Sequence, residues 1–170
     1  PEIWLRVSGL GAEGRTVDFD GRTWPVRVAT PEAFEGVDIA IFSAGGGTSK
    51  TLAPEAAARG AVVVDNSSQW RMEPGVPLVV AGVNDEDAAE HEGIIANPNC
   101  STMQLMPLFK ALRDSVGMKR VIVDTYQAVS GAGLQGTTDL VEGTQAQLAG
   151  NEFKYEAFSH PIAFNAVPQI

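Results

Sequence analysis

Residues 37–65 read VDIAIFSAGGGTSKTLAPEAAARGAVVVD, and this stretch decides the fold class. The run Val37–Ser43 is apolar and continuous, which is typical of a strand buried on both faces. Residues 44–47 break the strand, and the alanine-rich segment Thr48–Arg59, followed by a glycine, indicates a helix. Ala61–Asp65 has the pattern of a second buried strand. Strand, glycine turn, helix and strand in this order form a βαβ unit, so we expect two parallel strands.

The rest of the chain continues this α/β pattern on both sides of the unit. Upstream, the dipeptide Asp20-Gly21 is typical of a tight hairpin turn. The other expected strands are Trp4–Ser8, Thr16–Asp20, Thr23–Val28, Leu78–Val80, Ile94–Ala96 and Lys119–Gln127. The other expected helices are Asp85–Glu90, Thr137–Leu148 and Cys100–Val116, the last of which is apolar over most of its surface and is expected to be buried. The composition changes near Lys119, so we predict two parts, residues 1–118 and 119–170.

The composition is that of a globular protein and narrows the possible functions. Hydrophobic residues make up 44% of the 170 positions, enough apolar surface to offset the chain entropy lost on folding. A formal net charge of −9 argues against nucleic-acid binding, which needs clustered Lys and Arg. The apolar runs are too short to span a bilayer, no secretory signal opens the chain, and one cysteine cannot form an internal disulfide. We therefore expect a cytoplasmic protein with neither nucleic acid nor membrane as partner.

The single cysteine lies in the most informative stretch, Asn97-Pro98-Asn99-Cys100-Ser101-Thr102. Asn99 is a good N-cap, so Cys100 is expected in the first turn of the following helix. Unpaired backbone N–H groups and the positive end of the helix dipole surround that position, and both stabilise a thiolate, the nucleophilic form of cysteine. The same N–H groups can stabilise an oxyanion once a carbonyl is attacked. From the residues alone, a reactive thiol and an inert core cysteine are both open.

This stretch resembles the active-site motif of the aspartate-semialdehyde dehydrogenases, and three other stretches resemble motifs of that family in the same order. Ser43–Gly47 is similar to the family's glycine turn on the cofactor side. Val64–Arg71 is similar to its Asp-Asn-Ser-Ser-x-Trp/Phe-Arg segment, and Thr125–Gly133 to its Tyr-Gln-Ala-x-Ser-Gly-Ala-Gly segment. Four co-linear motifs are far more specific than a single glycine pattern. The resemblance covers the chain from about Thr16 onward.

The resemblance implies a fold in two domains. Residues 1–118 would be a Rossmann-type, parallel-sheet NAD(P)-binding domain that carries the nucleophile helix, and residues 119–170 would begin an α+β catalytic and dimerisation domain. The family's first strand and Gly-x-x-Gly-x-x-Gly turn do not occur before Trp4, and its substrate-binding Arg and catalytic His do not occur before Ile170. We therefore expect an internal fragment that turns over no substrate on its own.

The resemblance also implies an activity, the NADPH-dependent reductive dephosphorylation of L-4-aspartyl phosphate to L-aspartate 4-semialdehyde in lysine, threonine and methionine biosynthesis. Cys100 would form the thioester, and Gln127 would orient the substrate or a water. Arg71 would bind phosphate and Asn99 would contact phosphate or the thioester oxygen. A homodimer or homotetramer is expected. The cofactor would lie along small residues, namely Ser43, Ala44, Gly45, Gly46, Asn66, Ser67, Ser68, Ser130 and Gly131.

The choice of cofactor follows from the family and not from the local sequence. The family usually holds the NADP 2′-phosphate with an Arg-Ser pair after its second strand. Residues 8–14 contain no Arg, and Glu13 would repel a phosphate, which leaves Arg15 as a substitute. NADP is therefore the expected cofactor, and NAD stays open.

The residues around Cys100 also bear on four alternative functions. N-acetyl-glutamyl-phosphate reductases carry a Gly before the nucleophile where this chain has Asn99, and glyceraldehyde-phosphate dehydrogenases flank their Cys differently. A non-catalytic assembly module or fold relic would not need an intact Cys100. A cofactor-free cysteine hydrolase would need a His base, and neither His91 nor His160 lies in a motif that suggests one. Two His and one Cys do not make a zinc site, so no metal is expected.

Overall fold

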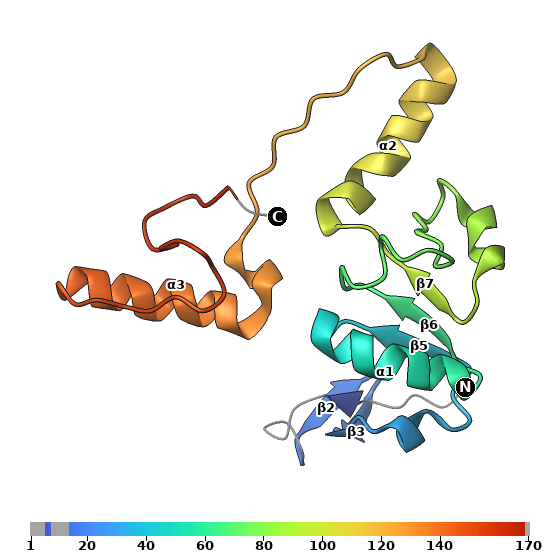
Figure 1. Cartoon of the computed structure of the whole chain (residues 1–170), viewed down its shortest axis with the longest axis horizontal. Coiled ribbons are helices and arrows are strands. Elements are labelled where there is room, and N and C mark those ends of the chain that lie inside the picture. The colour runs from blue at the N-terminus through green and yellow to red at the C-terminus, as the bar shows by residue number, and fades with distance from the viewer. Residues whose placement is uncertain (1–5, 8–13, 169–170) are drawn as a thin grey trace. The chain divides into compact units, whose positions relative to one another are not determined.

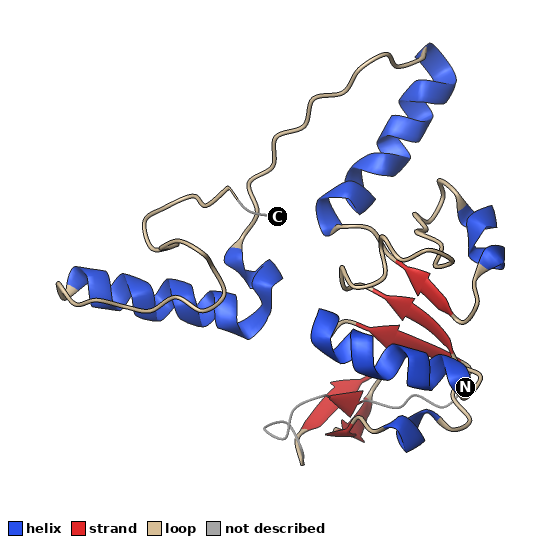
Figure 2. Cartoon of the chain, in the orientation of Figure 1, coloured by secondary structure: helices blue, strands red, loops and turns tan. Residues whose placement is uncertain are grey.

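The structure is a computed structural model that describes residues 6–7 and 14–168 (Figure 1). It forms two compact units, Pro1–Arg120 and Val121–Ile170, and each is described by itself. All strands among the described residues belong to the first unit (Figure 2). Most of the strand expected at Trp4–Ser8 lies outside the described residues, as does Glu13, which bears on the cofactor choice.

The βαβ unit predicted from residues 37–65 is confirmed. Strands β5 (Ile39–Phe42) and β6 (Val62–Asp65) are parallel neighbours joined by helix α1 (Gly46–Ala58), and β7 (Ile94–Ala96) pairs in parallel with β6 on its other side. The register pairs Phe42 with Asp65, and Asp65 in turn with Ala96. The carboxyl ends of the three strands therefore lie side by side, and the segments that follow them leave the sheet at one edge.

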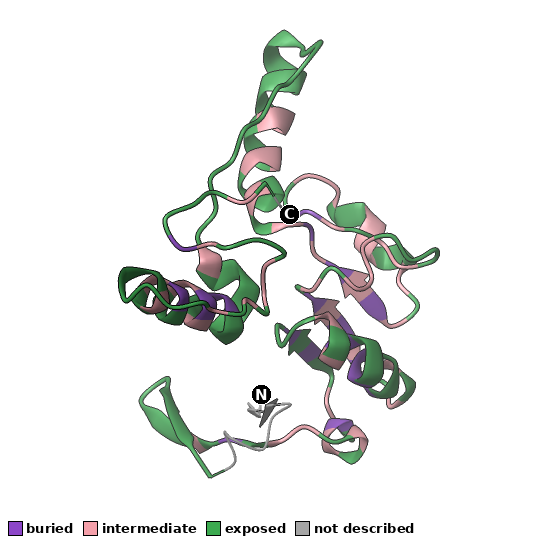
Figure 3. Cartoon of the chain, turned by 60° about the vertical axis from the view of Figure 1, so that its left-hand side comes forward, coloured by how far each residue is buried: buried purple, intermediate pink, exposed green. Residues whose placement is uncertain are grey.

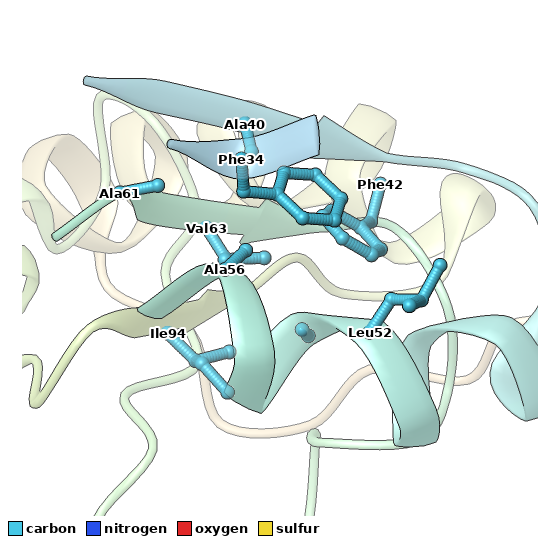
Figure 4. Close-up of a cluster of buried hydrophobic side chains, with 9 residues drawn as sticks. Phe34, Ala40, Phe42, Leu52, Ala56, Ala61, Val63 and Ile94 are labelled. Carbon is cyan, nitrogen blue, oxygen red and sulfur yellow. The ribbon is translucent and has the colours of Figure 1, made fainter. Parts of the chain in front are cut away.

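The core of the first unit lies between α1 and one face of this sheet (Figure 4). Val63 of the central strand is fully buried there, and the rings of Phe34 and Phe42 stack with their centroids 5.6 Å apart. Side chains alternate along a strand, so the neighbours of Phe42 point the other way. Ile39 and Ile41 are 67% and 75% exposed, which leaves the second face of the sheet open along β5.

A small hairpin precedes the parallel sheet. Strands β2 (Thr16–Phe19) and β3 (Arg22–Pro25) are antiparallel, and the two turn residues between them both have positive φ angles, 50° at Asp20 and 68° at Gly21. Such a turn matches the twist of the strands, which confirms the predicted hairpin. The strand predicted at Thr23–Val28 is divided, because β4 (Arg27–Val28) pairs in parallel with β1 (Arg6–Val7) instead.

Two short elements differ from the prediction. The strand expected at Leu78–Val80 is reduced to one isolated bridge, Leu78 with Ala96, and the helix Asp85–Glu90 is a 3-10 helix. Asn84 accounts for the local geometry, because its Oδ1 accepts the backbone N–H of Val80 at 2.8 Å. A side chain that bonds to the backbone in this way competes with strand and helix hydrogen bonds.

Helix α2 (Cys100–Val116) has the predicted bounds, but its predicted burial is wrong. None of its residues is buried, and Leu108 and Val116 are 56% and 79% exposed (Figure 3). An apolar helix surface is buried only where another element covers it. Lys110 Nζ donates to the carbonyl of Val83 at 3.0 Å and so ties the middle of α2 to the loop after residue 80.

The strand predicted at Lys119–Gln127 is absent: the chain bends at Lys119, and residues 120–127, most of which belong to the second unit, form no strand. The apolar pattern that suggested a strand is present, yet Ile122 and Tyr126 are 73% and 95% exposed. A strand needs a partner for its N–H and C=O groups, and the described residues of this unit supply none.

Helix α3 (Gly133–Leu148) organises the rest of the second unit and begins four residues before the predicted start. A 3-10 turn, Val129–Ala132, precedes it. The tail after residue 150 returns along α3 and is held by the buried carboxyl group of Asp139, which accepts the backbone N–H groups of Glu156 and Ala157 at 2.9 and 2.7 Å. Within the described part of the chain, no helix has the length and apolarity required to cross a membrane.

Candidate active site

Cys100 is the first residue of α2, as the sequence predicted. The side chain of Asn99 caps the helix by accepting the backbone N–H of Ser101 at 2.9 Å, and its carbonyl accepts the N–H of Met103 at 2.9 Å. Cys100 is exposed, and its Sγ donates weakly to Asn99 Oδ1 at 4.0 Å. The thiol is therefore accessible to a substrate and lies at the positive end of a helix of 17 residues.

The turn before Cys100 is held from both sides. The backbone N–H of Asn97 donates to the carbonyl of Asp65 at 2.8 Å, which continues the pairing of β6 and β7 by one residue. The side-chain amide of Asn97 donates to Asn66 Oδ1 at 2.5 Å. These bonds fix the Asn97–Asn99 turn to the end of the central strand.

Arg71 lies beside the same turn. Its Nε donates to the carbonyl of Asn97 at 2.8 Å and its Nη2 to the carbonyl of Asn66 at 3.1 Å. A guanidinium has five N–H donors, so these two bonds leave it able to bind an anion as well. The structure thus brings the predicted phosphate ligand next to the turn that carries Asn99 and Cys100.

The predicted cofactor residues of the first unit also gather at this edge of the sheet. Residues 43–46 follow β5 and lead into α1, where Gly45 caps the helix with φ 85°. Ser43, Ala44 and Gly45 are exposed, so the backbone at the start of α1 can be approached closely. Asn66–Ser68 follow β6 in the same way. In open parallel sheets, ligands bind at the carboxyl ends of the strands, and the predicted residues occupy that position after all three strands.

The remaining predicted residues, Gln127, Ser130 and Gly131, belong to the second unit. All three are exposed, and Gln127 Nε2 donates to Thr125 Oγ1 at 3.3 Å. Ser130 and Gly131 lie in the 3-10 turn that leads into α3. Their roles stay predictions.

A buried polar network near the predicted site was missed by the sequence reasoning. Asp65 and Ser49 are 0% and 1% exposed, and the Ser49 hydroxyl donates to the Asp65 carboxyl group. Trp70 Nε1 in turn donates to Ser49 Oγ at 2.8 Å. The signal available in the sequence was a serine within an alanine-rich helix and an aspartate that ends an apolar strand.

The two histidines belong to different units. His91 Nδ1 accepts the backbone N–H of Gly93 at 2.9 Å and so closes a turn after the 3-10 helix. His160 is exposed in the second unit, with its Nδ1 3.1 Å from Ser159 Oγ. Among the residues that the structure describes, no three His, Cys, Asp or Glu side chains are grouped as metal ligands would be.

Comparisons with known proteins relate both parts of the chain to one family. Residues 7–91 match the family model described as "Semialdehyde dehydrogenase, NAD binding domain", and residues 107–170 match "Semialdehyde dehydrogenase, dimerisation domain". The chain is 52% identical over 163 residues to the aspartate-semialdehyde dehydrogenase of Aquifex aeolicus, covering 94% of this chain and 48% of that protein. It is 49% identical over 171 residues to that of Bacillus subtilis, covering 96% and 49%.

A solved structure with a similar fold is also called an aspartate semialdehyde dehydrogenase. The crystal structure of aspartate semialdehyde dehydrogenase II from Vibrio cholerae, complexed with ASA, aligns with a TM-score of 0.85 and 44% identity over 100% of this chain and 51% of that one. The chain therefore spans about half the length of the proteins that it matches.

Proposed function

The chain belongs to the semialdehyde dehydrogenase family, and we propose that it is part of an aspartate-semialdehyde dehydrogenase with Cys100 as its nucleophile. One observation carries the proposal most strongly. The turns after β5, β6 and β7 meet at one edge of the sheet, and they hold the predicted cofactor segments, the predicted phosphate ligand and the thiol at the start of α2.

In the proposed mechanism, the substrate in the biosynthetic direction is an acyl phosphate. The Cys100 thiolate attacks the acyl carbon, the carbon–oxygen bond to phosphate breaks, and the carbon is left as a thioester with the departed phosphate carrying the electron pair. Backbone N–H groups at the start of α2 stabilise the oxyanion that forms during the attack. Arg71, which already lies at the turn before Cys100, binds the phosphate, and Asn99 contacts the phosphate or the thioester oxygen.

The second half of the reaction reduces the thioester to the aldehyde. A nicotinamide cofactor bound at the site would supply the hydride, while Cys100 would hold the carbonyl carbon as the thioester until its sulfur leaves as thiolate and the aldehyde is released. The chain's part is to seat the dinucleotide on residues 43–46 and 66–68, where small side chains and the N-terminus of α1 suit a pyrophosphate. Ser130 and Gly131 would complete this contact, and Gln127 would orient the substrate. We propose NADP as the cofactor, with NAD as the alternative.

The whole protein is proposed to be a homodimer or homotetramer in the cytoplasm. The match of residues 107–170 to a dimerisation domain supports association. Analytical ultracentrifugation of the intact protein distinguishes the two states, because the molar mass that it measures is twice as large for a tetramer as for a dimer.

Replacement of the nucleophile tests the proposed function. The intact protein that carries this sequence should reduce NADP⁺ with aspartate semialdehyde only when phosphate is present, followed by absorbance of the reduced cofactor. Cys100→Ser should lower kcat by roughly a thousandfold or more, because a serine hydroxyl stays protonated near neutral pH and is a much weaker nucleophile than a cysteine thiolate. Full activity of the Cys100→Ser protein, or a rate independent of phosphate, would contradict the proposal.

A further inference from the structure

A polar network that the proposed mechanism does not use is buried at the carboxyl edge of the sheet. Asp65 ends β6 with 0% of its surface exposed. One of its carboxyl oxygens accepts the hydroxyl of Ser49 from α1, and the other accepts the backbone N–H of Ser67. Ser49 accepts Trp70 Nε1–H at 2.8 Å. An indole N–H only donates and a hydroxyl has one proton, so donation runs from Trp70 through Ser49 to Asp65.

The energetic cost of this arrangement indicates a specific role. A buried carboxyl group is unfavourable unless both of its oxygens are hydrogen-bonded, and an apolar residue at Asp65 would suit the surrounding core. The network satisfies both oxygens and at the same time connects α1, the end of β6 and the loop formed by residues 66–71. Within the described residues, no buried side-chain N or O atom lacks a partner, so the network is complete.

The loop that this network holds is bonded directly to the turn before Cys100. Arg71, at the end of the loop, donates to the carbonyl of Asn97 at 2.8 Å. The Asn97 N–H donates to the carbonyl of Asp65 itself at 2.8 Å, and its side chain donates to Asn66 at 2.5 Å. The backbone N–H, the carbonyl and the side chain of Asn97 are therefore all hydrogen-bonded, either to Asp65 or to the loop that Asp65 anchors.

We infer that Asp65 is a positioning residue for the nucleophile. Its carboxyl group fixes the 66–71 loop, the loop and the Asp65 carbonyl fix Asn97, and Asn97 sets where the Asn99 cap and Cys100 begin α2. Ser49 and Trp70 act through Asp65. The inference rests on the proposed function of Cys100 for its biological meaning, but the placement of the thiol can be measured without any turnover.

Asp65→Asn tests the inference with a side chain of nearly the same size. Asn offers one acceptor and two donors, so either Ser67 N–H or the Ser49 hydroxyl loses its acceptor. The measurement is the rate of Cys100 alkylation by iodoacetamide against pH in the intact protein, followed by mass spectrometry of the Cys100 peptide. At each pH the alkylation rate should fall roughly threefold, because a displaced cap weakens the helix-end stabilisation of the thiolate.

Asp87→Asn is the matched control. Asp87 also accepts a side-chain amide, that of Asn84 at 2.7 Å, but it has no bond to the Asn97–Asn99 turn. Its alkylation profile should overlap that of the wild type. A general loss of stability would not move the profile of the folded protein, so circular dichroism is recorded at each pH.

An Asp65→Asn profile that overlaps the wild type in a folded protein overturns the inference. If Asp65→Asn does not fold, Trp70→Phe decides by the same criterion, because it keeps an aromatic ring and removes the indole N–H that donates to Ser49. A lowered alkylation rate of Cys100 in Trp70→Phe supports the inference, and an unchanged rate overturns it. Failure of the proposed function is distinguishable, because it would appear as absent dehydrogenase activity in the wild type whatever the alkylation profiles show.

Discussion

The residue that starts α2 shows how a local rule of chain geometry sets up chemistry. Asn99 accepts the Ser101 N–H and Cys100 follows it, an arrangement that the sequence Asn97–Thr102 predicts because capping depends on neighbours only. The buried network behind it is different. Asp65 meets Ser49 from 16 residues earlier, and nothing in the local sequence determines which distant side chains come together. The position of the thiol in the first turn of α2 could therefore be predicted from the sequence. The buried network of Asp65, Ser49 and Trp70 could not.

Removing the cap should weaken α2 at its first turn. Asn99→Ala deletes the acceptor for the Ser101 N–H, and such a loss costs about 1 kcal/mol of stability. Chemical denaturation of the intact protein measures the change in the free energy of unfolding. Ser115→Ala at the other end of α2 is the control, since it removes only a hydroxyl bonded to the Ala111 carbonyl and should stay within about 0.5 kcal/mol of the wild type. Equal effects of the two changes would contradict the assigned cap.

At the scale of elements, the second unit depends on one buried carboxyl group. Burial of Asp139 raises its pKa, but hydrogen bonds from the backbone of Ala157, the side chain of Gln135 and the backbones of Glu156 and Phe158 together outweigh burial, so the pKa is lowered. A folded pKa below the unfolded value means that the ionised group contributes its full stabilisation above the unfolded pKa. That contribution is lost as the pH falls through the folded pKa.

The tail should therefore detach from α3 in acid. Amide hydrogen exchange at Glu156 and Ala157, corrected for intrinsic rates, should show strong protection at pH 7 and a marked loss below about pH 4. In Asp139→Asn the amide oxygen can still accept both N–H groups, but the NH2 group then faces the Gln135 donor and the negative charge is lost, so the tail should be loosened already at pH 7. Equal protection at both pH values in the wild type would show that Asp139 does not hold the tail.

The elements differ in how far the sequence could predict them. The bounds of α2 follow from Asn99 at one end and Gly117, with φ 76°, at the other. The burial of α2 and the strand at Lys119–Gln127 could not be predicted, because both depend on what covers or pairs with the segment. The hydrophobic pattern indicates which surface of a segment is apolar, but it does not indicate whether another described segment packs against that surface.

At the scale of the whole molecule, exposed apolar surface is the dominant feature. Ile41 on β5, Val116 on α2 and Ile122 in the segment after α2 are 75%, 79% and 73% exposed. These side chains lie on a strand, a helix and a segment with strand-like pattern, which globular proteins normally cover. The chain spans about half the length of its relatives.

The 170-residue polypeptide alone should be inactive and should bind apolar dyes. We expect no phosphate-dependent reduction of NADP⁺ and strong fluorescence with a dye such as ANS, since the exposed side chains offer it a surface. A full-length relative, assayed in parallel, provides the active and dye-poor control. A measurable dehydrogenase rate from the isolated polypeptide would show that the residues present suffice for catalysis.

The position of the core along the chain has a consequence for the order of synthesis. All buried residues of the main cluster lie between Phe34 and Ile94, whereas the thiol comes at residue 100. A chain that emerges from the ribosome N-terminus first can begin to close this core before the whole of α2 has emerged. The sheet and α1, which determine where Cys100 lies, would then begin to fold before α2 is fully available. The nucleophile would therefore dock onto a domain that is already partly folded.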